Sequence, residues 1–342
     1  MLKFKTLKNK IIIAEIGLSH NGSMSKAKKL IDLTSKSGAD VIKFQTHYAD
    51  EESTIDEKFR KGFNFKHKNR FEYWKAHEFT QQEWVILKKY AKKKRLIFSS
   101  SPFSIKAYDI LKKAGVDIWK IGSGEFFSNH LNNLILKDKR PIIISTGMCN
   151  WKEISTKVKL LKKKKKNFLI MQCTSKYPLN LKEVGMNVIS KISKKYNCPV
   201  GLSDHSGSIS PSLMALSDDI TKVIEVHVSE PKNFNNPDRA SSISFEQLKL
   251  ICEHRDNLKI LKKNNIDKDK MSKQLLKTRE LFTKSIAVKK NLKIGKVILL
   301  NDLCFKKPGN GIKESKINNI LGKKLIKNVN YNKLLKWTDL EK

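Results

Sequence analysis

Residues 11–17 read IIIAEIG, and the stretch MSKAKKLIDLTSKSG follows at residues 24–38. The first stretch is a nearly continuous apolar run, which is typical of a strand buried on both faces in a parallel sheet. In the second stretch the apolar residues recur at the spacing of one helix face. Together they predict a strand followed by a helix, that is, a single βα unit.

The same order of strand and helix repeats along the first 250 or so residues of the chain. Further strands are predicted at residues 40–47, 96–103, 117–125, 141–147, 168–175, 199–206 and 223–230. Eight βα units of this kind predict a (β/α)8 TIM barrel. An open doubly wound sheet is the alternative, but no GxGxxG turn follows the first strand to support it.

The composition and the hydrophobic pattern of the sequence change after the predicted barrel, which we place at residues 1–260. Residues 261–282 are polar, rich in lysine and periodic, and they predict a linker helix. Residues 283–342 carry short apolar runs separated by turns such as PGNG, and they predict a small, mostly β domain. A domain of this size is marginally stable alone, so we expect it to pack against something else.

The composition limits the class of protein. The chain has 342 residues, of which 39% are hydrophobic, enough for a large core. It contains no run of about 18 uncharged apolar residues, so no membrane span is expected. The basic and then apolar start resembles a signal peptide, but Glu15 interrupts it and no small-residue cleavage site follows. Five cysteines spread singly predict no disulfide framework and fit the cytoplasm.

The formal net charge is +37, and such a charge can indicate binding to nucleic acid or to an anionic membrane surface. The excess is almost entirely lysine, whereas base recognition favours the fork of arginine, and no recognition motif accompanies the charge. We therefore interpret it as biased lysine usage that also steers anionic substrates, and nucleic acid is not an expected partner. A non-catalytic basic protein that binds RNA or anionic lipid is the alternative from a different class.

Polar residues gather at the downstream ends of the predicted strands, where a TIM barrel builds its active site. They are Glu15, Lys43, Gln45, Lys120, Ser123, Glu125, Ser145, Ser203, Asp204, His205 and His227. A charged residue in an apolar strand is costly to bury unless it is paired or solvated. Lys43 and Lys120, from two different strands, therefore suggest a pocket for an anion, although for either one a salt bridge at the barrel end explains the position equally well.

Two histidines end two successive strands. His205 lies in GLSDHS and His227 in VIEVHVS. Their imidazoles could converge on one cation and leave coordination positions open for water or substrate, which suits a Lewis-acid role. A hydrogen-bonded structural histidine at each strand end is the alternative.

The chain resembles the bacterial sialic acid synthase family in seven stretches that follow one another in the same order. They are IIIAEIGLSHNG (11–22), VIKFQTH (41–47), WKIGSGE (119–125), ISTGM (144–148), CTSKYP (173–178), GLSDHSG (201–207) and EVHVS (225–229). The tail around KKPGNGI (306–312) resembles the antifreeze-like (SAF) domain that follows the barrel in that family. The resemblance implies a TIM barrel with a SAF domain, working as a domain-swapped homodimer.

The resemblance also implies an activity. Phosphoenolpyruvate, an N-acylated hexosamine such as N-acetylmannosamine, and water would give a nine-carbon 2-keto-3-deoxy acid and phosphate. Close alternatives are synthases of N,N'-diacetyllegionaminate or pseudaminate. The family's divalent cation is most often Mn²⁺, with Mg²⁺ or Co²⁺ able to replace it, and His205 and His227 would be its ligands.

The remaining family residues carry over position by position. Glu15, Glu125 and Lys120 would be catalytic, with Glu125 accepting the proton of the attacking water. Residues that would bind the substrates are Lys43, Gln45, Ser123, Ser145, Ser175, Tyr177, Ser203, Asp238 and Lys307. Phosphoenolpyruvate is a small anion of high charge, so lysines and hydroxyl groups in a dry barrel mouth suit it.

Two positions depart from the family pattern. Ser175 stands where asparagine is common, and Lys307 stands where the SAF domain usually presents an arginine to the acyl sugar. A point charge thus replaces a planar fork, which puts the identity of the sugar in question. A barrel aldolase that forms a Schiff base on Lys120 is the nearest alternative enzyme.

Overall fold

The computed structural model describes residues 2–59, 67–177, 179–230 and 237–342. The chain forms two compact units, Met1–Lys263 and Asn264–Lys342.

The first unit is a closed barrel of eight parallel strands. They are β1 Ile11–Gly17, β2 Val41–Thr46, β3 Ile97–Pro102, β4 Ile118–Ile121, β5 Ile142–Ser145, β6 Phe168–Cys173, β7 Val200–Asp204 and β8 Thr221–Val228. Each strand pairs with the next, and β1 pairs with β8, which closes the cylinder. A two-residue strand, β9 (Ser242–Ile243), continues beyond β8. The predicted TIM barrel is thereby confirmed.

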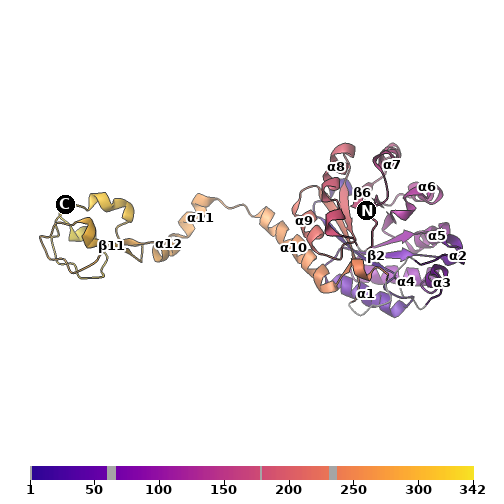
Figure 1. Ribbon diagram of the computed structural model, residues 1–342, viewed down its shortest axis with the longest axis horizontal. Helices are drawn as coiled ribbons and strands as arrows, with labels where there is room; N and C mark the ends of the chain where they lie inside the picture. The colour runs from indigo at the N-terminus through magenta and orange to yellow at the C-terminus, as the bar shows by residue number, and fades with distance from the viewer. Residues whose placement is uncertain (1, 60–66, 178, 231–236) are drawn as a thin grey trace. The chain divides into compact units, whose positions relative to one another are not determined.

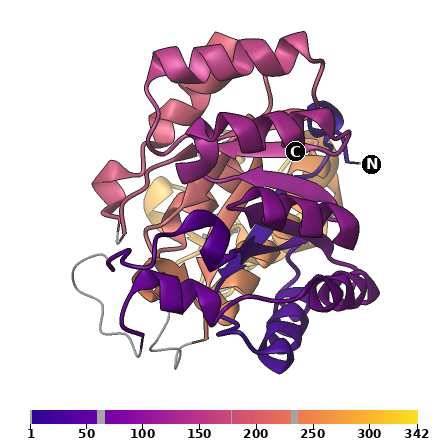
Figure 2. The same cartoon turned by 90° about the vertical axis from the view of Figure 1, so that its right-hand side faces the viewer.

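Helices surround the strands of this unit (Figures 1 and 2). The helices that follow the strands are α1 Met24–Lys36, α4 Gln81–Lys93, α5 Ile105–Ala114, α6 Asn129–Lys137, α7 Trp151–Lys163, α8 Met186–Tyr196, α9 Ser210–Ser217 and α10 Phe245–Lys263. The connection from β2 to α4 also holds two short helices, α2 (Ala49–Glu52) and α3 (Arg70–Lys75). In the described part of the chain, no helix combines the length and the apolar character that a membrane span requires.

Helix α4 illustrates why these segments are helical. Thr80 and Glu83 form a reciprocal capping box that satisfies donors at its first turn. Trp84, Leu87 and Ala91 follow at helical spacing and are all buried against the barrel. The helix thus buries one apolar face and exposes its lysines.

The strands divide the barrel interior into an apolar lower end and a polar upper end. Successive side chains of a strand face opposite sides, so every second residue points into the cylinder. The inward-facing residues near the strand starts form one buried cluster, which the completely buried ring of Phe4 joins from the short 3₁₀ turn Phe4–Thr6. Two residues further along the same strands, the inward-facing side chains become charged or carry hydroxyl groups. The site described below lies at this upper end.

The second unit contains helices α11 (Lys268–Gln274) and α12 (Leu276–Phe282), followed by an antiparallel pair of strands, β10 (Ser285–Val288) and β11 (Leu303–Lys306). The predicted linker stretch, residues 261–282, is thus occupied by the end of α10 and by these two short helices. Isolated bridges, such as Ala287 with Leu334, tie later segments to the sheet. Its small core is formed by Ile286, Val288, Leu292, Ile298, Leu303, Ile312, Ile320, Leu325, Val329, Leu335 and Leu340.

Candidate active site

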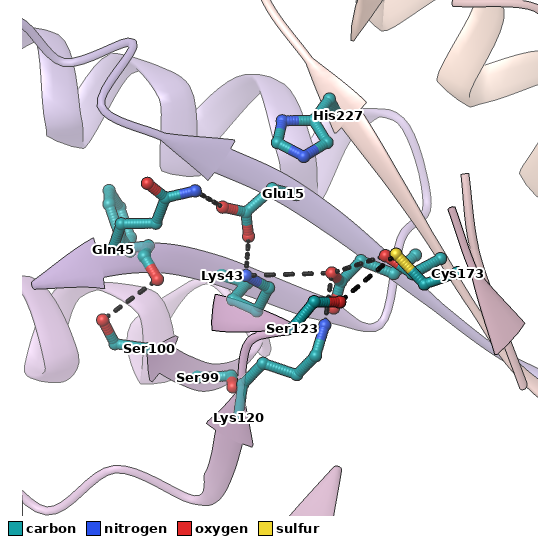
Figure 3. A network of polar contacts seen from close by, with 12 residues as sticks. Glu15, Lys43, Gln45, Ser99, Ser100, Lys120, Ser123, Cys173 and His227 are labelled. Carbon is teal, nitrogen blue, oxygen red and sulfur yellow. Dashed lines mark hydrogen bonds and ion pairs between the residues drawn. The ribbon is translucent and has the colours of Figure 1, made fainter. Parts of the chain in front are cut away.

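Glu15, Lys43 and Gln45 meet inside the upper end of the barrel. Glu15 lies on β1, and Lys43 and Gln45 lie two residues apart on the neighbouring strand β2, so all three face inward. Lys43 Nζ forms an ion pair with Glu15 Oε2, and Gln45 Nε2 donates to Glu15 Oε1 over 3.0 Å. Figure 3 shows the Glu15 carboxyl group held between the amide of Gln45 and the ammonium of Lys43.

A second buried ion pair lies beside the first. Lys120, on β4, places its Nζ 2.5 Å from Glu225 Oε1, and Ser203 Oγ donates to the same oxygen over 3.1 Å. Lys43 Nζ lies 3.8 Å from this oxygen, so Glu225 links both lysines. The sequence analysis named both lysines but not Glu225. Two residues before His227 on β8, it faces the interior in the same way, and the alternation of the strand could have revealed it.

The network contains two lysines and two carboxylates, and each lysine forms an ion pair with one carboxylate. Burial raises the pKa of Glu15, and the attraction of Lys43 offsets this effect only in part. Burial acts in the same direction on Glu225, but the charges of Lys120 and Lys43 outweigh it and lower the pKa of Glu225 to about 2. Glu225 is therefore the fixed negative charge of the site, and Glu15 is the carboxyl group that is easier to protonate.

Hydroxyl groups and a thiol line a niche next to the lysines. Gly147 N donates to Ser123 Oγ over 2.9 Å, and Ser123 Oγ lies 3.7 Å from Cys173 Sγ. A Cβ atom added to Gly147 would lie 2.8 Å from Ser123 Oγ and would also collide with Ser175 Oγ. Ser145 is buried, and its Oγ has no hydrogen-bond partner in the described part of the chain. Buried hydroxyl groups of this kind suit the oxygen atoms of an anionic ligand.

His205 and His227 lie side by side, as expected for the ends of adjacent strands. Their ring centroids are 5.0 Å apart. His205 Nδ1 lies 3.0 Å from the carbonyl oxygen of Thr174, so Nδ1 carries a hydrogen atom, and in the neutral ring the lone pair is on Nε2. Tyr177 OH lies 3.0 Å from that Nε2 and donates to it when the ring is neutral. His227 Nδ1 lies 3.6 Å from Asp238 Oδ2.

The protonation of the two rings differs. Burial strongly lowers the pKa of His227, and the positive charge of a protonated His205 acts in the same direction. Burial also lowers the pKa of His205, but Cys173 and the Thr174 carbonyl group outweigh this effect and raise it to about 8. In the described residues, no group of three or more His, Cys, Asp and Glu side chains is arranged to hold a metal ion. The arrangement therefore offers two imidazoles at most, with other positions open.

A cavity of about 520 Å³ opens beside His227, and its volume lies within the usual range of small-molecule sites. Tyr177, His227, Asp238 and Glu125 are among its lining residues. Glu125 accepts a hydrogen bond from Ser128 Oγ at 2.5 Å, and burial raises its pKa. The cavity is also lined by Gln45, which contacts the lysine network through its hydrogen bond to Glu15.

Lys307 belongs to the second unit. It precedes Pro308 at a cis peptide bond, and its Nζ lies 5.2 Å from the centroid of the Phe282 ring. The other residues named from the sequence lie in the first unit, in the lysine network, the niche, the histidine pair or the cavity, except Asp204, whose carboxylate accepts hydrogen bonds from Ser206.

A family model described as the NeuB family matches residues 30–267, more than half of the chain. The chain belongs to the NeuB family. A model of the SAF domain matches residues 283–341. Both matches confirm the resemblance found in the sequence, including its C-terminal domain.

Characterised relatives of this NeuB-family chain carry three related names. It is 32% identical to an N,N'-diacetyllegionaminic acid synthase of Campylobacter jejuni, over 96% of this chain and 100% of that protein. It is 30% identical to a pseudaminic acid synthase of the same species, over 98% of both chains. A crystal structure of an N-acetylneuraminic acid synthetase from Leptospira borgpetersenii, in complex with citrate, superposes with a TM-score of 0.67 at 29% identity, over 80% of this chain and 92% of that one.

Three further cavity residues of this NeuB-family barrel escaped the sequence analysis. His47 directly follows β2, Glu52 ends α2, and Arg70 begins α3. All three line the cavity. Glu52 and Arg70 lie on short helices, away from the strand ends, whereas His47 follows β2 as His205 follows β7 and could have been found by the same criterion.

Proposed function

We propose that the chain condenses phosphoenolpyruvate with an N-acylated hexosamine and water, giving a nine-carbon 2-keto-3-deoxy sugar acid and phosphate. The three acids in the relatives' names are of this kind, so the reaction class is common to them and the sugar is what differs. The observation that carries the proposal is the buried network of Lys43, Lys120, Glu15 and Glu225 beside the hydroxyl-lined niche. It offers cations and hydroxyl donors to the phosphate and carboxylate oxygens of phosphoenolpyruvate.

When phosphoenolpyruvate binds, the two lysines exchange part of their interaction with carboxylates for an interaction with the ligand. An incoming anion takes over part of the interaction that Lys43 and Lys120 make with their carboxylates, while Ser123 and Ser145 donate to its oxygen atoms. The barrel mouth is dry, so these contacts are stronger than they would be in water and hold the enolate in one orientation. The N-acetylneuraminic acid synthetase of Leptospira is named in complex with citrate, itself a multiply charged anion, which agrees with such a site.

Bond formation requires two proton transfers. C3 of phosphoenolpyruvate attacks the aldehyde carbon of the open-chain sugar, and the aldehyde oxygen gains a proton. The cation left at C2 captures water, and the water loses a proton. The C2–O bond to phosphate then breaks while the new C2 hydroxyl group gives its proton to the leaving phosphate and becomes the keto group. Glu225 remains ionised and stabilises the positive charge near C2. Burial raises the pKa of Glu15 and of Glu125, which makes each carboxylate a stronger base, and we assign acceptance of the water proton to Glu125.

A divalent cation fits the two histidines. In its neutral form His205 would present the Nε2 lone pair while the Thr174 carbonyl group fixes its Nδ1–H, as is usual for metal-bound histidines, and the proton that the raised pKa keeps on the ring would be displaced by the ion. His227 is neutral, as a ligand must be. When bound, the ion, Mn²⁺ by preference and Mg²⁺ or Co²⁺ as substitutes, would polarise the aldehyde oxygen of the sugar.

The test is phosphate release from phosphoenolpyruvate with a panel of sugars: N-acetylmannosamine, its 6-phosphate and 2,4-diacetamido hexoses. At least one sugar should give sugar-dependent release that EDTA abolishes and Mn²⁺ restores. We expect His227→Ala to retain the fold, checked by circular dichroism, and to lose more than nine-tenths of the turnover at saturating Mn²⁺. Release that survives EDTA, or a variant that keeps more than a tenth of the activity, would contradict the role of the metal.

One observation favours the Schiff-base alternative. Burial lowers the pKa of Lys120 more than Glu225 raises it, and a lysine with a lowered pKa is the usual nucleophile of such aldolases. Borohydride added with a keto acid would then trap a covalent adduct on Lys120. We expect no adduct, because the 2.5 Å ion pair with Glu225 retains the proton.

We further propose that the second unit acts in a homodimer, where it would cover the active site of the partner and bring Lys307 to the acyl group of the sugar. Helices α11 and α12 have no buried residue, and isolated helices of seven residues are unstable in water, so they need a packing partner. A chain truncated before residue 283 should stay folded but lose most of its synthase activity. The five free cysteines agree with a reducing compartment, and we propose the cytoplasm.

A further inference from the structure

Glu52 and His47 form a polar pair behind Gln45, at the wall of the cavity. Glu52 Oε1 lies 2.6 Å from His47 Nδ1. His47 Nε2 in turn lies 3.3 Å from Gln45 Oε1. Since Gln45 also donates to Glu15, as Figure 3 shows, these contacts form one chain from the cavity wall to a carboxyl group of the proposed catalytic centre.

The direction of each hydrogen bond in this chain follows from chemistry. The Glu15 carboxyl group, which also faces the ammonium of Lys43, accepts, so Gln45 turns its NH₂ group toward Glu15. The acceptor of Gln45, its Oε1, then faces His47. His47 Nε2 must therefore carry a hydrogen atom, because two acceptors facing each other would repel.

The same reasoning fixes the other side of the ring. If His47 is neutral with its hydrogen on Nε2, its Nδ1 has a lone pair and Glu52 must donate as a carboxylic acid. If the proton moves to Nδ1, Glu52 is ionised and the ring is cationic. In both cases one proton lies between Glu52 and His47. When that proton is lost, the carboxylate attracts the remaining N–H to Nδ1, and the lone pair of Nε2 faces Gln45.

Burial agrees with a proton held mainly on Glu52. Glu52 Oε2 is buried and has no hydrogen-bond partner among the residues that the structure describes, an expensive position for a charged oxygen. His47 is held between the parallel rings of Trp74 and Phe103, each with its centroid 4.1 Å away. Burial lowers the pKa of His47 to about 3, and the positive charge of Arg70 acts in the same direction.

The charged groups around Glu52 come from several elements. Burial and then the negative charge of Glu57 raise its pKa to about 8, Glu78 adds to this, and Arg70 opposes it. Glu125, across the cavity, also interacts with Glu52. Because the pKa of Glu52 is raised above its ordinary value, the proton is present below pH 8 or so and is lost as the pH rises through that value.

We propose that Glu52 and His47 are positioning residues: the proton they share turns Gln45 toward Glu15 and so fixes the Glu15 carboxyl group at the reacting centre. This inference rests on the proposed function, because it assigns a task to the same site. It gives the condensation an alkaline limit set by two residues that act through Gln45.

The test compares two substitutions of similar size in the full-length protein. Glu52→Gln keeps an N–H that can donate to His47 Nδ1 but cannot ionise, whereas Glu52→Met offers no donor. We expect Glu52→Gln to keep most of the wild-type kcat at pH 7 and to lose the decline of kcat between pH 7 and 9.5. Glu52→Met should lower kcat about tenfold across the whole range, with the KM for phosphoenolpyruvate changed much less.

A second measurement does not need activity. In protein labelled with ¹⁵N-histidine, the His47 signals, assigned by their loss in His47→Phe, should show hydrogen on Nε2 at pH 7 and its departure from Nε2 in step with Glu52 ionisation. An Nε2 without hydrogen at pH 7, an alkaline limb that persists in Glu52→Gln, or wild-type kinetics in Glu52→Met would each overturn the inference. If the wild-type chain releases no phosphate with any sugar, the proposed function fails while the tautomer measurement still decides the pairing.

Discussion

The two ends of the barrel interior are built from the same strands in opposite ways. On β1, the inward-facing residue Ile13 is followed two positions later by Glu15, and on β8 Val223 is followed by Glu225. The lower end gains stability by removing apolar surface from water. At the upper end, two lysines and two carboxylates lose their hydration, and their mutual attraction offsets little more than that cost. The difference indicates that the lower end supplies most of the stability of the barrel, whereas the upper end serves the reaction.

Removing Glu225 should have the largest effect. In Glu225→Ala, Lys120 and Lys43 lose the carboxylate that links them, and an uncompensated charge stays buried. We expect the free energy of unfolding to fall by about 3–5 kcal/mol and the condensation to become undetectable. Urea denaturation followed by circular dichroism measures the first effect, and phosphate release measures the second.

The matched control removes the whole pair. Lys120→Met combined with Glu225→Leu replaces two buried charges by apolar groups of similar size, while Lys43 keeps its partner Glu15. Stability should return to within about 1 kcal/mol of the wild type, because such replacements are often neutral or stabilising. Activity should stay absent. A double variant as unstable as Glu225→Ala would show that the upper end does contribute to stability.

A change at the lower end should have the opposite profile. Phe4 is completely buried among the inward-facing residues at the strand starts. Phe4→Ala leaves a cavity there, and we expect the free energy of unfolding to fall by about 3 kcal/mol. At a temperature well below its melting point, the variant should keep the wild-type kcat. A lowered kcat in fully folded Phe4→Ala would mean that the two ends are mechanically coupled.

The sequence was sufficient for the barrel because its strands are uninterrupted apolar runs. The predicted strand 141–147, for example, contains β5 at Ile142–Ser145. It was also sufficient for the polar residues that end those runs, such as Lys43 and His205. It did not reveal Glu225, which lies inside a run that was interpreted as apolar throughout.

The sequence predicted which residues lie in the site better than it predicted which of them contact one another. The sequence could not tell whether Lys43 and Lys120 face an anion or a salt bridge, because that depends on the register of strands distant in the chain. The register aligns Glu15 with Lys43, whereas Lys120 on β4 meets Glu225 on β8, a strand with which β4 does not pair. The positioning role of Glu52 depends on a helix of four residues that has no periodic pattern to detect.

The variant Gly147→Ala tests the hydroxyl-lined niche without changing the lysine network. Gly147→Ala places a methyl group 2.8 Å from Ser123 Oγ and 2.9 Å from Cys173 Sγ, where we expect phosphoenolpyruvate to bind. The KM for phosphoenolpyruvate should rise about tenfold, equal to about 1.4 kcal/mol of binding. The free energy of unfolding should fall by only about 1 kcal/mol, since the neighbours are side chains that can adjust.

Gly122→Ala provides the control, because a Cβ at that position meets no atom within 4 Å. It should leave both KM and stability unchanged. Equal effects of the two alanines on KM would place the substrate elsewhere in the upper end.

The smallest effect on stability is expected at Ser145, where the two ends of the interior adjoin. Its buried Oγ has no hydrogen-bond partner in the described chain, so Ser145→Ala removes an unpaired polar group and should change the free energy of unfolding by less than about 1 kcal/mol, in the stabilising direction. Ser99→Ala is the comparison, because Ser99 Oγ donates to the Ile118 carbonyl group over 3.0 Å and its loss should destabilise by about 1 kcal/mol. Only Ser145→Ala should raise the KM for phosphoenolpyruvate. If Ser145→Ala instead destabilises the protein and leaves KM unchanged, its hydroxyl group belongs to the structural end of the barrel and not to the site.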